Sequence, residues 1–267
     1  MPTCPPPLHS QGLRYKAVIF DIGGVVMRSP FIAIAAYERK QALPVDYINT
    51  SIVGYGSHGA WQKFERGEID IKSFYSAFGR DLSDTVHGNK CYRKYCDRKG
   101  IPCPQLPGKL EVDGRELFGA MMRASQLYDP FMREAILRIR AAGKHRVIAL
   151  TNNFARVDVP KEELDFLGWN EGVIPSHLRD LFDDFCDSSA LGMRKPEPEF
   201  YLAACKRSDI RPADAIFLDD IGLNLKAAKQ LGMDTIHVRI GETLDAVKIL
   251  ESRIGLNLTN TMSDAKL

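Results

Sequence analysis

Three apolar runs, each followed at once by polar residues, constrain the fold of this chain more than any other feature of its sequence. The runs and their followers are Ala17–Phe20 before Asp21, Val147–Leu150 before Thr151, and Ala215–Leu218 before Asp219 and Asp220. Uninterrupted apolar runs of this kind are typical of strands buried on both faces of a sheet. Helical patterns separate the runs, and this repetition favours an α/β fold with a parallel sheet. The polar residues then lie at the carboxyl edge of that sheet, where open α/β sheets bind ligands.

The segment 29–125 interrupts the repetition of strand and helix. Amphipathic helical patterns at Phe31–Leu43, Ser57–Arg66 and Ile71–Leu82 predict an inserted helical cap. The other segments are assigned as a Rossmann-like core at 15–28 and 126–257, a flexible proline-rich tail at 1–14, and a polar tail at 258–267.

Composition and charge exclude several classes of protein. The chain of 267 residues is 45% hydrophobic and 26% charged, which is typical of a globular protein. Its formal net charge of +2 offers no basic field for nucleic acid. No uncharged apolar run approaches the roughly 18 residues of a membrane span, so none is expected. The sequence leaves the oligomeric state open.

The six cysteines show no paired C-x-x-C spacing and are too few for a disulfide scaffold in a chain of this length. A reducing compartment is therefore expected. The stretch Gly88–Gly108 is polar and contains three prolines, which predicts an exposed loop. A zinc site is the alternative interpretation there, but the spacing of its candidate ligands matches no common zinc pattern. These candidates are His87, Cys91, Cys96 and Cys103.

Two features of the chain bear on its location in the cell. Met1–Pro7 contains four prolines and no basic apolar leader, so it does not resemble a secretory signal. The terminal Ala265-Lys266-Leu267 resembles the Ser-Lys-Leu peroxisomal address. The sequence leaves the cytoplasm and the peroxisome as alternatives.

Asp21 is the first candidate for a chemical role. It precedes Gly23 and Gly24, which permit a tight turn whose amide groups approach an anion. A carboxylate placed there is a candidate nucleophile. The alternative is an aspartate that only caps the turn.

Asp219 and Asp220 are adjacent carboxylates at a strand end, and their repulsion raises one pKa unless a cation is present. Oxygen ligands alone select a hard ion, and Mg²⁺ fits best. The alternative is a pair that caps the helix starting near Gly222.

Thr151 offers a hydroxyl at the end of the second apolar run. The amides of the following loop at Asn152 and Asn153 add donors for phosphoryl oxygens. The alternative is an ordinary polar loop, which has the same composition.

Lys195 lies directly before Pro196, which would fix the lysine ahead of the next helix. A positive charge held there can pair with Asp21 and offset the charge of a transferred phosphoryl group. The alternative is a solvated basic turn. The occurrence of four such features at one predicted sheet edge favours a functional site.

The order Asp21, Thr151, Lys195 and Asp219-Asp220 resembles the four motifs of the haloacid dehalogenase-like hydrolases. The strongest resemblance is to the N-terminal phosphatase domain of soluble epoxide hydrolase and its stand-alone relatives. It extends from about Tyr15 to Thr261 and includes Arg66-Gly67-Glu68-Ile69 in the cap. The chain has no Gly-x-Ser-x-Gly motif, so epoxide hydrolysis is not expected.

The resemblance implies a Rossmann-like core with a helical cap and a Mg²⁺-dependent phosphatase acting on a sugar, isoprenoid or lipid phosphate. Asp21 would attack phosphorus and form an aspartyl-phosphate that water hydrolyses. The implied metal ligands are Asp21, the carbonyl of Gly23 and Asp220, with Asp219 acting through water. The implied phosphate-binding residues are Thr151, Asn152 and Lys195.

The chain departs from the family pattern at Gly23. Most phosphatases of the family have there a second aspartate that protonates the leaving group. Two alternative functions therefore stay open: a dehalogenase, because a departing halide needs no proton, and a catalytically silent protein that only binds a phosphorylated ligand.

Overall fold

The predicted strands pair into one parallel sheet in the computed structural model, which describes residues 14–154, 159–169 and 174–259. The sheet order is β3-β2-β1-β4-β5, and the strands are β1 Ala17–Phe20, β2 Arg146–Thr151, β3 Asp184–Asp187, β4 Ala215–Asp219 and β5 Asp234–His237. β1 lies in the centre, where Phe20 is opposite both Ala149 of β2 and Leu218 of β4. The predicted α/β fold with a parallel sheet is confirmed.

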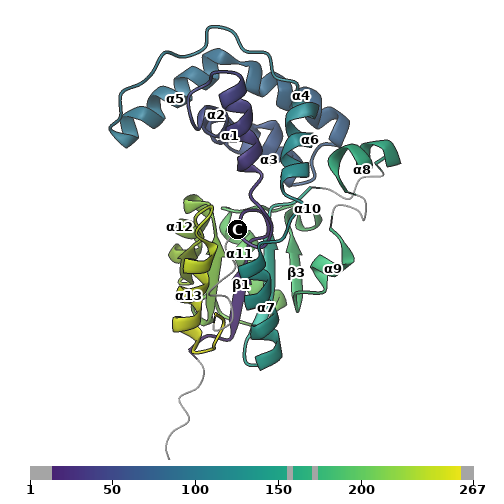
Figure 1. Ribbon diagram of the computed structural model, residues 1–267, viewed down its shortest axis with the longest axis vertical. Coiled ribbons are helices and arrows are strands. Elements are labelled where there is room, and N and C mark those ends of the chain that lie inside the picture. The colour runs from purple at the N-terminus through teal and green to yellow at the C-terminus, as the bar shows by residue number, and fades with distance from the viewer. Residues whose placement is uncertain (1–13, 155–158, 170–173, 260–267) are drawn as a thin grey trace, which may run out of the picture.

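Helices cover both faces of the sheet (Figure 1). The α-helices of the core are α7 Pro130–Ala142, α8 Lys161–Leu167, α9 Ser176–Arg179, α10 Ser188–Leu191, α11 Pro198–Arg207, α12 Gly222–Gln230 and α13 Thr243–Ile254. Val18 and Phe20 of β1 lie in one apolar cluster with α7 and α13. Ala17 and Ile19 lie in a second cluster with α11 and α12. Because successive strand residues point to opposite faces, β1 needs an apolar residue at every position.

The start and the end of α7 follow from its sequence. The carboxylate of Asp129 accepts a hydrogen bond from the backbone N–H of Met132 at 2.9 Å, and Pro130 occupies the first turn. The helix ends at Gly143, which has a φ of 62°. Both ends of α7 therefore lie at residues whose type favours a helix terminus.

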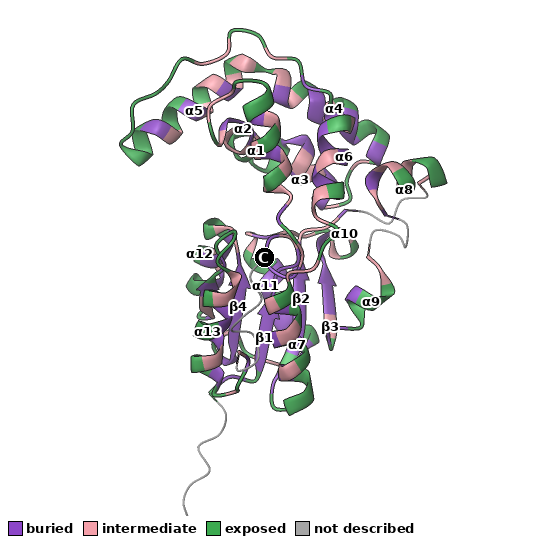
Figure 2. Cartoon of the chain, in the orientation of Figure 1, coloured by how far each residue is buried: buried purple, intermediate pink, exposed green. Residues whose placement is uncertain are grey.

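The helical cap lies over the carboxyl edge of the sheet (Figure 1). Its α-helices are α1 Phe31–Lys40, α2 Tyr47–Gly54, α3 Ala60–Glu65, α4 Ile71–Ser83, α5 Thr85–Lys99 and α6 Gly114–Ala124. Residues 29–125, which the structure describes throughout, contain no strand. Figure 2 shows that buried residues gather in the strands and on the inner sides of the cap helices.

The apolar cluster of the cap extends into the segments that follow β2. The ring of Phe154 stacks on Phe64 of α3 with a centroid distance of 4.9 Å, and Trp169 packs edge-on against Phe118 of α6 at 6.2 Å. The domain boundaries predicted from the sequence assign Phe154 and Trp169 to the core. In the structure these two residues instead pack with the cap, so part of the β2–β3 connection anchors the cap to the core.

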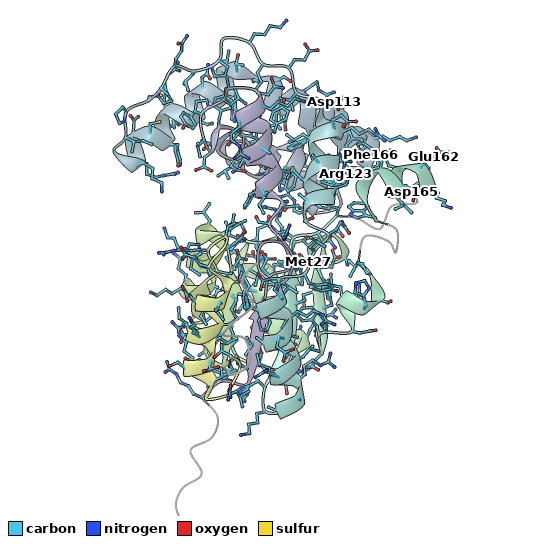
Figure 3. All side chains as sticks on the ribbon, in the orientation of Figure 1. Met27, Asp113, Arg123, Glu162, Asp165 and Phe166 are labelled. Carbon is cyan, nitrogen blue, oxygen red and sulfur yellow. The ribbon has the colours of Figure 1, made fainter. Side chains whose placement is uncertain are left out.

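Helix α8 strengthens the same anchor. The guanidinium of Arg123 on α6 donates to the carbonyl oxygen of Phe166 at 2.6 Å, and Figure 3 shows the two residues side by side. Arg115 of α6 forms a bidentate ion pair with Glu163, and their shortest N–O distance is 2.9 Å. The cap thus contacts the core away from the strand ends as well as above them.

Helix α5 corrects one prediction. The first half of Gly88–Gly108 is helical, so the prediction of an exposed loop is wrong there. The residues Gly88, Tyr92 and Cys96 recur every four positions and are buried, which is the pattern of a helix face packed on a neighbour. All three prolines lie beyond Gly100, where the helix ends, and residues 101–108 are not helical.

The interpretation of His87 and Cys91 changes with this correction. They are neighbours on α5, with the Sγ of Cys91 3.4 Å from the Nε2 of His87. Within the described ranges, the only group of three or more His, Cys, Asp or Glu residues placed to hold a metal ion lies at the strand ends. No zinc site is therefore assigned to α5.

Four further predictions concern the ends of the chain and the membrane. The tail at 1–14 lies outside the described residues except for Arg14, and so does the tripeptide Ala265-Lys266-Leu267. The tail predicted at 258–267 begins with a fully buried Leu258, whose N–H and that of Thr259 donate to Glu251 of α13. None of the helices in the described ranges combines the length and apolar character that a bilayer crossing requires.

Candidate active site

The carboxyl edge of the sheet brings together polar residues from three strand ends. Asp21 directly follows β1, Thr151 ends β2 and Asp219 ends β4. The backbone N–H of Asp21 donates to the carbonyl of Leu218 at 2.9 Å, which extends the pairing of β1 and β4 by one residue. Because β1 and β4 are parallel neighbours, Asp21 and Asp219 lie side by side.

Lys195 joins these two aspartates. Its Nζ lies 2.8 Å from the Oδ1 of Asp21 and 2.8 Å from the Oδ2 of Asp219, and the lysine is only 1% exposed. Burial alone lowers the pKa of Lys195, but the two carboxylates hold it above its usual value. The lysine is therefore a fixed positive charge, and removing one partner of such a buried pair costs roughly 3–5 kcal/mol of stability.

Asn152 holds the backbone of Lys195 in place. The side-chain Oδ1 of Asn152 accepts from the backbone N–H of Lys195 at 2.7 Å, and its Nδ2 donates to the carbonyl of Lys195 at 2.9 Å. These two bonds use the side-chain oxygen and one of the two N–H groups of Nδ2. The side chain therefore positions the lysine, and the backbone N–H of Asn152 is a candidate donor to a phosphoryl oxygen.

Asp219 is held by protein groups on both carboxylate oxygens. Besides Lys195, its Oδ1 accepts from the backbone N–H of Ile221 at 2.7 Å, and both oxygens lie 3.1 Å from the Nδ2 of Asn224. Neither the composition nor the helical pattern singles out Asn224 as a site residue. Its place at the first turn of α12, facing the preceding strand end, is the signal that links it to Asp219.

Asp220 is held more loosely than Asp219. Its Oδ2 lies 3.4 Å from the hydroxyl of Ser29, a buried residue that the sequence does not indicate. Its Oδ1 is buried and has no hydrogen-bond partner among the described residues. Burial, together with the negative charges of Asp21 and Asp219, raises the pKa of Asp220 well above its usual value. Burial also raises the pKa of Asp21, against the opposing effect of Lys195.

The donor set of this cluster fits a divalent metal ion. Asp21, Asp219 and Asp220 each offer one oxygen, and these atoms all lie within 4.8 Å of one another. A buried carboxylate oxygen without a partner is costly unless a donor or a cation satisfies it, and the Oδ1 of Asp220 is such an atom. A donor set made only of oxygens selects a hard ion such as Mg²⁺.

The two glycines after Asp21 have different structural requirements. Gly24 has a φ of +87°, and a Cβ at this position would lie 2.1 Å from the Oδ2 of Asp220. Gly24 therefore lets Asp220 approach the turn. Gly23 has an ordinary φ, and the nearest atom to a Cβ there would be the Cδ of Pro30 at 3.6 Å, a normal van der Waals distance.

The loop after β2 supplies fewer donors than the sequence suggests. The backbone N–H of Asn153 donates to the hydroxyl of Ser188 at 2.9 Å, so this amide is already occupied. The Thr151 hydroxyl makes only a long contact of 3.4 Å to the carbonyl of Asn152. Thr151 therefore keeps a hydroxyl that can turn towards a ligand.

A cleft of about 1020 Å³ lies between the core and the cap. Asp21, Gly23, Thr151, Lys195 and Asp220 line its core side. The cap and its anchoring segment contribute an apolar wall, formed by Phe31, Ile34, Ile52, Trp61, Met121, Met122, Phe154 and Trp169. Polar cap residues also line the cleft, among them Asp46, Asn49, Gln62, Lys99 and Ser125. Met27, which also lines the cleft, lies where the chain passes from the core to the cap (Figure 3). An ionic cluster and an apolar wall thus share one cavity.

Known proteins resemble this chain over most of its length. It is 32% identical over 252 residues to mouse acyl-CoA dehydrogenase family member 10 and 28% identical over 250 residues to pig bifunctional epoxide hydrolase 2. These matches cover 94% and 93% of the chain but only 20% and 40% of the relatives. It is 25% identical to the sesquiterpene phosphatase astK of Aspergillus oryzae, over 84% of the chain and 90% of that protein.

Solved structures show the same fold. A haloacid dehalogenase family enzyme from Bacteroides thetaiotaomicron, solved with magnesium and inorganic phosphate, matches with a TM-score of 0.50 and 19% identity. That match covers 85% of this chain and 96% of the bacterial chain. The family profile described as haloacid dehalogenase-like hydrolase matches residues 15–232, which include the whole ionic cluster. The chain belongs to the haloacid dehalogenase-like hydrolases.

Proposed function

We propose that this protein is a Mg²⁺-dependent phosphatase that removes phosphate from a small phosphate monoester through an aspartyl-phosphate on Asp21. One observation carries the proposal: Lys195 holds Asp21 beside Asp220 in a cleft, and the buried Oδ1 of Asp220 has no partner in the part of the chain that the structure describes. The sesquiterpene phosphatase among the relatives supports the same reaction class.

Mg²⁺, held by Asp21, Asp220 and the carbonyl of Gly23, with Asp219 acting through water, would neutralise charge on the phosphoryl group. The carboxylate of Asp21 attacks phosphorus, and the bond between phosphorus and the alcohol oxygen breaks. Water then attacks the phosphorus of the aspartyl-phosphate, which restores the carboxylate and releases phosphate.

The other residues of the cluster orient and stabilise the reacting groups. Lys195 places a positive charge 2.8 Å from the attacking carboxylate, where it also offsets charge on the phosphoryl oxygens. The Thr151 hydroxyl and the backbone N–H of Asn152 donate to the same oxygens. Asp219 keeps the ammonium of Lys195 in place through a second contact of 2.8 Å.

Gly23 leaves the departing alcohol without the family's usual proton donor. A dehalogenase is the second candidate on this ground, because a halide leaves without a proton. The unpartnered Oδ1 of Asp220 favours the phosphatase, since a metal-free reaction gives this buried oxygen no role. Phosphate esters with good leaving groups are the favoured substrates.

The apolar cap wall supports a substrate with an apolar alcohol, such as an isoprenoid or lipid phosphate, over a sugar phosphate. Although the polar Asn49 and Gln62 of the cap line the same cleft, Trp61, Met121 and Phe154 offer a hydroxylated sugar no hydrogen-bonding groups apart from the indole N–H. They would instead remove a hydrocarbon chain from water. The relative from Aspergillus oryzae, named a sesquiterpene phosphatase, agrees with this choice.

A series of alkyl phosphates tests the substrate class. Each methylene that the cleft buries contributes up to about 0.8 kcal/mol, so kcat/KM is expected to rise up to roughly fourfold per carbon from butyl to octyl phosphate. Ribose 5-phosphate, a polar substrate of similar size, should fall below butyl phosphate. A preference for the sugar phosphate would reject the apolar substrate class but leave the phosphatase proposal standing.

A glycine substitution tests the metal site without touching a ligand. Gly24→Ala is expected to weaken Mg²⁺ binding at least tenfold, because the new Cβ would displace the carboxylate of Asp220. Isothermal titration calorimetry measures this, with circular dichroism as the check of folding. Gly222→Ala, at a position where a Cβ meets nothing within 4 Å, is the matched control and should bind Mg²⁺ like the wild type. Equal affinities in all three proteins would move the metal site away from Asp220.

A further inference from the structure

Two residues at the end of cap helix α3 contact the segment that carries Lys195. The carboxylate of Glu65 accepts from the Nε of Arg194 at 2.5 Å. The Nη1 of Arg66 lies 3.4 Å from the Oε1 of Glu197. Adjacent cap residues of opposite charge thus pair with core residues on either side of Lys195.

These contacts form a closed ring that includes the chain segment of Lys195. The carboxylate of Glu197 also accepts from the backbone N–H of Arg194 at 3.0 Å, which links the two core ends of the ring. The cap ends are linked by the peptide bond between Glu65 and Arg66. The backbone of Lys195 therefore cannot shift far without breaking an ion pair to the cap or its bonds to Asn152.

Glu65 is the most buried member of the ring. Its side chain is 6% exposed, against 16% for Arg194 and 35% for Glu197. Its backbone carbonyl accepts from the hydroxyl of Ser188 at 2.5 Å, and Ser188 in turn binds the loop after β2. A buried carboxylate with a single charged partner holds its geometry tightly, since the loss of that partner leaves an uncompensated charge.

We propose that Glu65 is a positioning residue for phosphoryl transfer, which holds Lys195 between Asp21 and Asp219 through its ion pair with Arg194. The inference rests on the proposed phosphatase function. It also makes the lysine's position depend on the seating of the cap, because Glu65 belongs to the cap and Arg194 to the core. Neither residue needs to touch the reacting atoms for this role.

The pair Arg115–Glu163 offers a matched control. It also joins the cap to the core, at an N–O distance of 2.9 Å, but it lies on α6 and α8 and does not contact the Lys195 segment. If Glu65 only fastened the cap, the loss of either pair would have similar effects. If Glu65 positions Lys195, only its own pair should affect the chemical step.

The test uses the full chain with Glu65→Gln, Arg194→Gln, the double variant of these two, and Glu163→Gln. The double variant removes both charges of the pair, so neither is left buried without its partner. It therefore keeps the test valid if a single variant folds poorly. The measurements are kcat and KM for an aryl phosphate, Mg²⁺-dependent binding of tungstate by calorimetry, and the melting temperature.

We expect Glu65→Gln to lower kcat by about 10- to 100-fold, to weaken tungstate binding, and to change KM little. The double variant should lose no more than either single variant, because one ion pair is removed in all three. Glu163→Gln should keep kcat within about twofold. A wild-type kcat in both Glu65→Gln and the double variant, or an equal loss in Glu163→Gln, would overturn the inference. If the wild-type protein neither hydrolyses the ester nor binds tungstate, the proposed function itself fails.

Discussion

Replacement of Asp21 by asparagine is expected to lower the turnover of phosphate esters by more than about 10⁴-fold while the protein stays folded. The amide has the shape of the carboxylate but cannot form an acyl-phosphate. Lys195 keeps Asp219 as its partner at 2.8 Å, so the buried ammonium is not left alone. Steady-state kinetics give the loss, and circular dichroism checks the fold.

Asp187→Asn is the matched control for this variant. Asp187 is a buried aspartate at the end of β3, and its carboxylate caps α10 by accepting from the backbone N–H groups of Ser189 and Ala190. Its replacement should change turnover only a few-fold. Acid quenching followed by mass spectrometry should find a phosphoryl group on Asp21 in the wild type and none in Asp21→Asn. Substantial turnover by Asp21→Asn would exclude this residue as the nucleophile.

Gly23→Asp is expected to raise the turnover of alkyl phosphates by up to about 10²- to 10⁴-fold, the range that general acid catalysis supplies. Most phosphatases of the family have their proton donor at this position. The backbone here has an ordinary φ, and a Cβ would meet only the Cδ of Pro30, at 3.6 Å. The Cβ of an aspartate therefore fits here without backbone strain.

The dependence of rate on the leaving group gives this prediction its control. In the wild type, rates across a series of aryl and alkyl phosphates should fall steeply as the leaving-group pKa rises, because charge on the departing oxygen is not neutralised. Gly23→Asp should flatten that slope. A shallow slope in the wild type would mean that another group already donates the proton, and that Gly23 does not restrict the substrate.

The sequence predicts the centre of the sheet well and its edges poorly, for one physical reason. The central strand Ala17–Phe20 is covered by helices on both faces, so burial requires four apolar residues in a row. The edge strands Asp184–Asp187 and Asp234–His237 each begin with an aspartate and are partly exposed. Neither shows an apolar run or a clean alternation, so pattern analysis does not find them.

The error at helix α5 has a different origin. Prolines and polar residues indicate a loop, and they do so correctly for residues 101–108. The helix before them buries only one narrow face, made of Gly88, Tyr92 and Cys96. Its sequence therefore contains few apolar residues and shows no clear helical pattern. Its stability depends on packing against α2, a contact between segments far apart in sequence.

Some residues of the candidate site can also be predicted from the sequence, and others cannot. Asp21, Thr151 and Asp219 lie at strand ends, so their convergence can be predicted from the order of strands and helices. The roles of Glu65 and Ser29 cannot, because each depends on where the cap settles over the core. Nothing in the sequence near Arg194 indicates that its partner is a cap carboxylate.

The most direct test of the proposed phosphatase is the release of inorganic phosphate from an aryl phosphate by the purified chain, with Mg²⁺, with EDTA, and with Mg²⁺ added back. We predict release that needs Mg²⁺, that stops in EDTA and returns on addition of the metal, and that is lost in Asp220→Asn. A full rate in EDTA would contradict the account and favour metal-free chemistry. Binding of tungstate without release of phosphate from any ester would contradict it too, and would identify a protein that only binds its ligand.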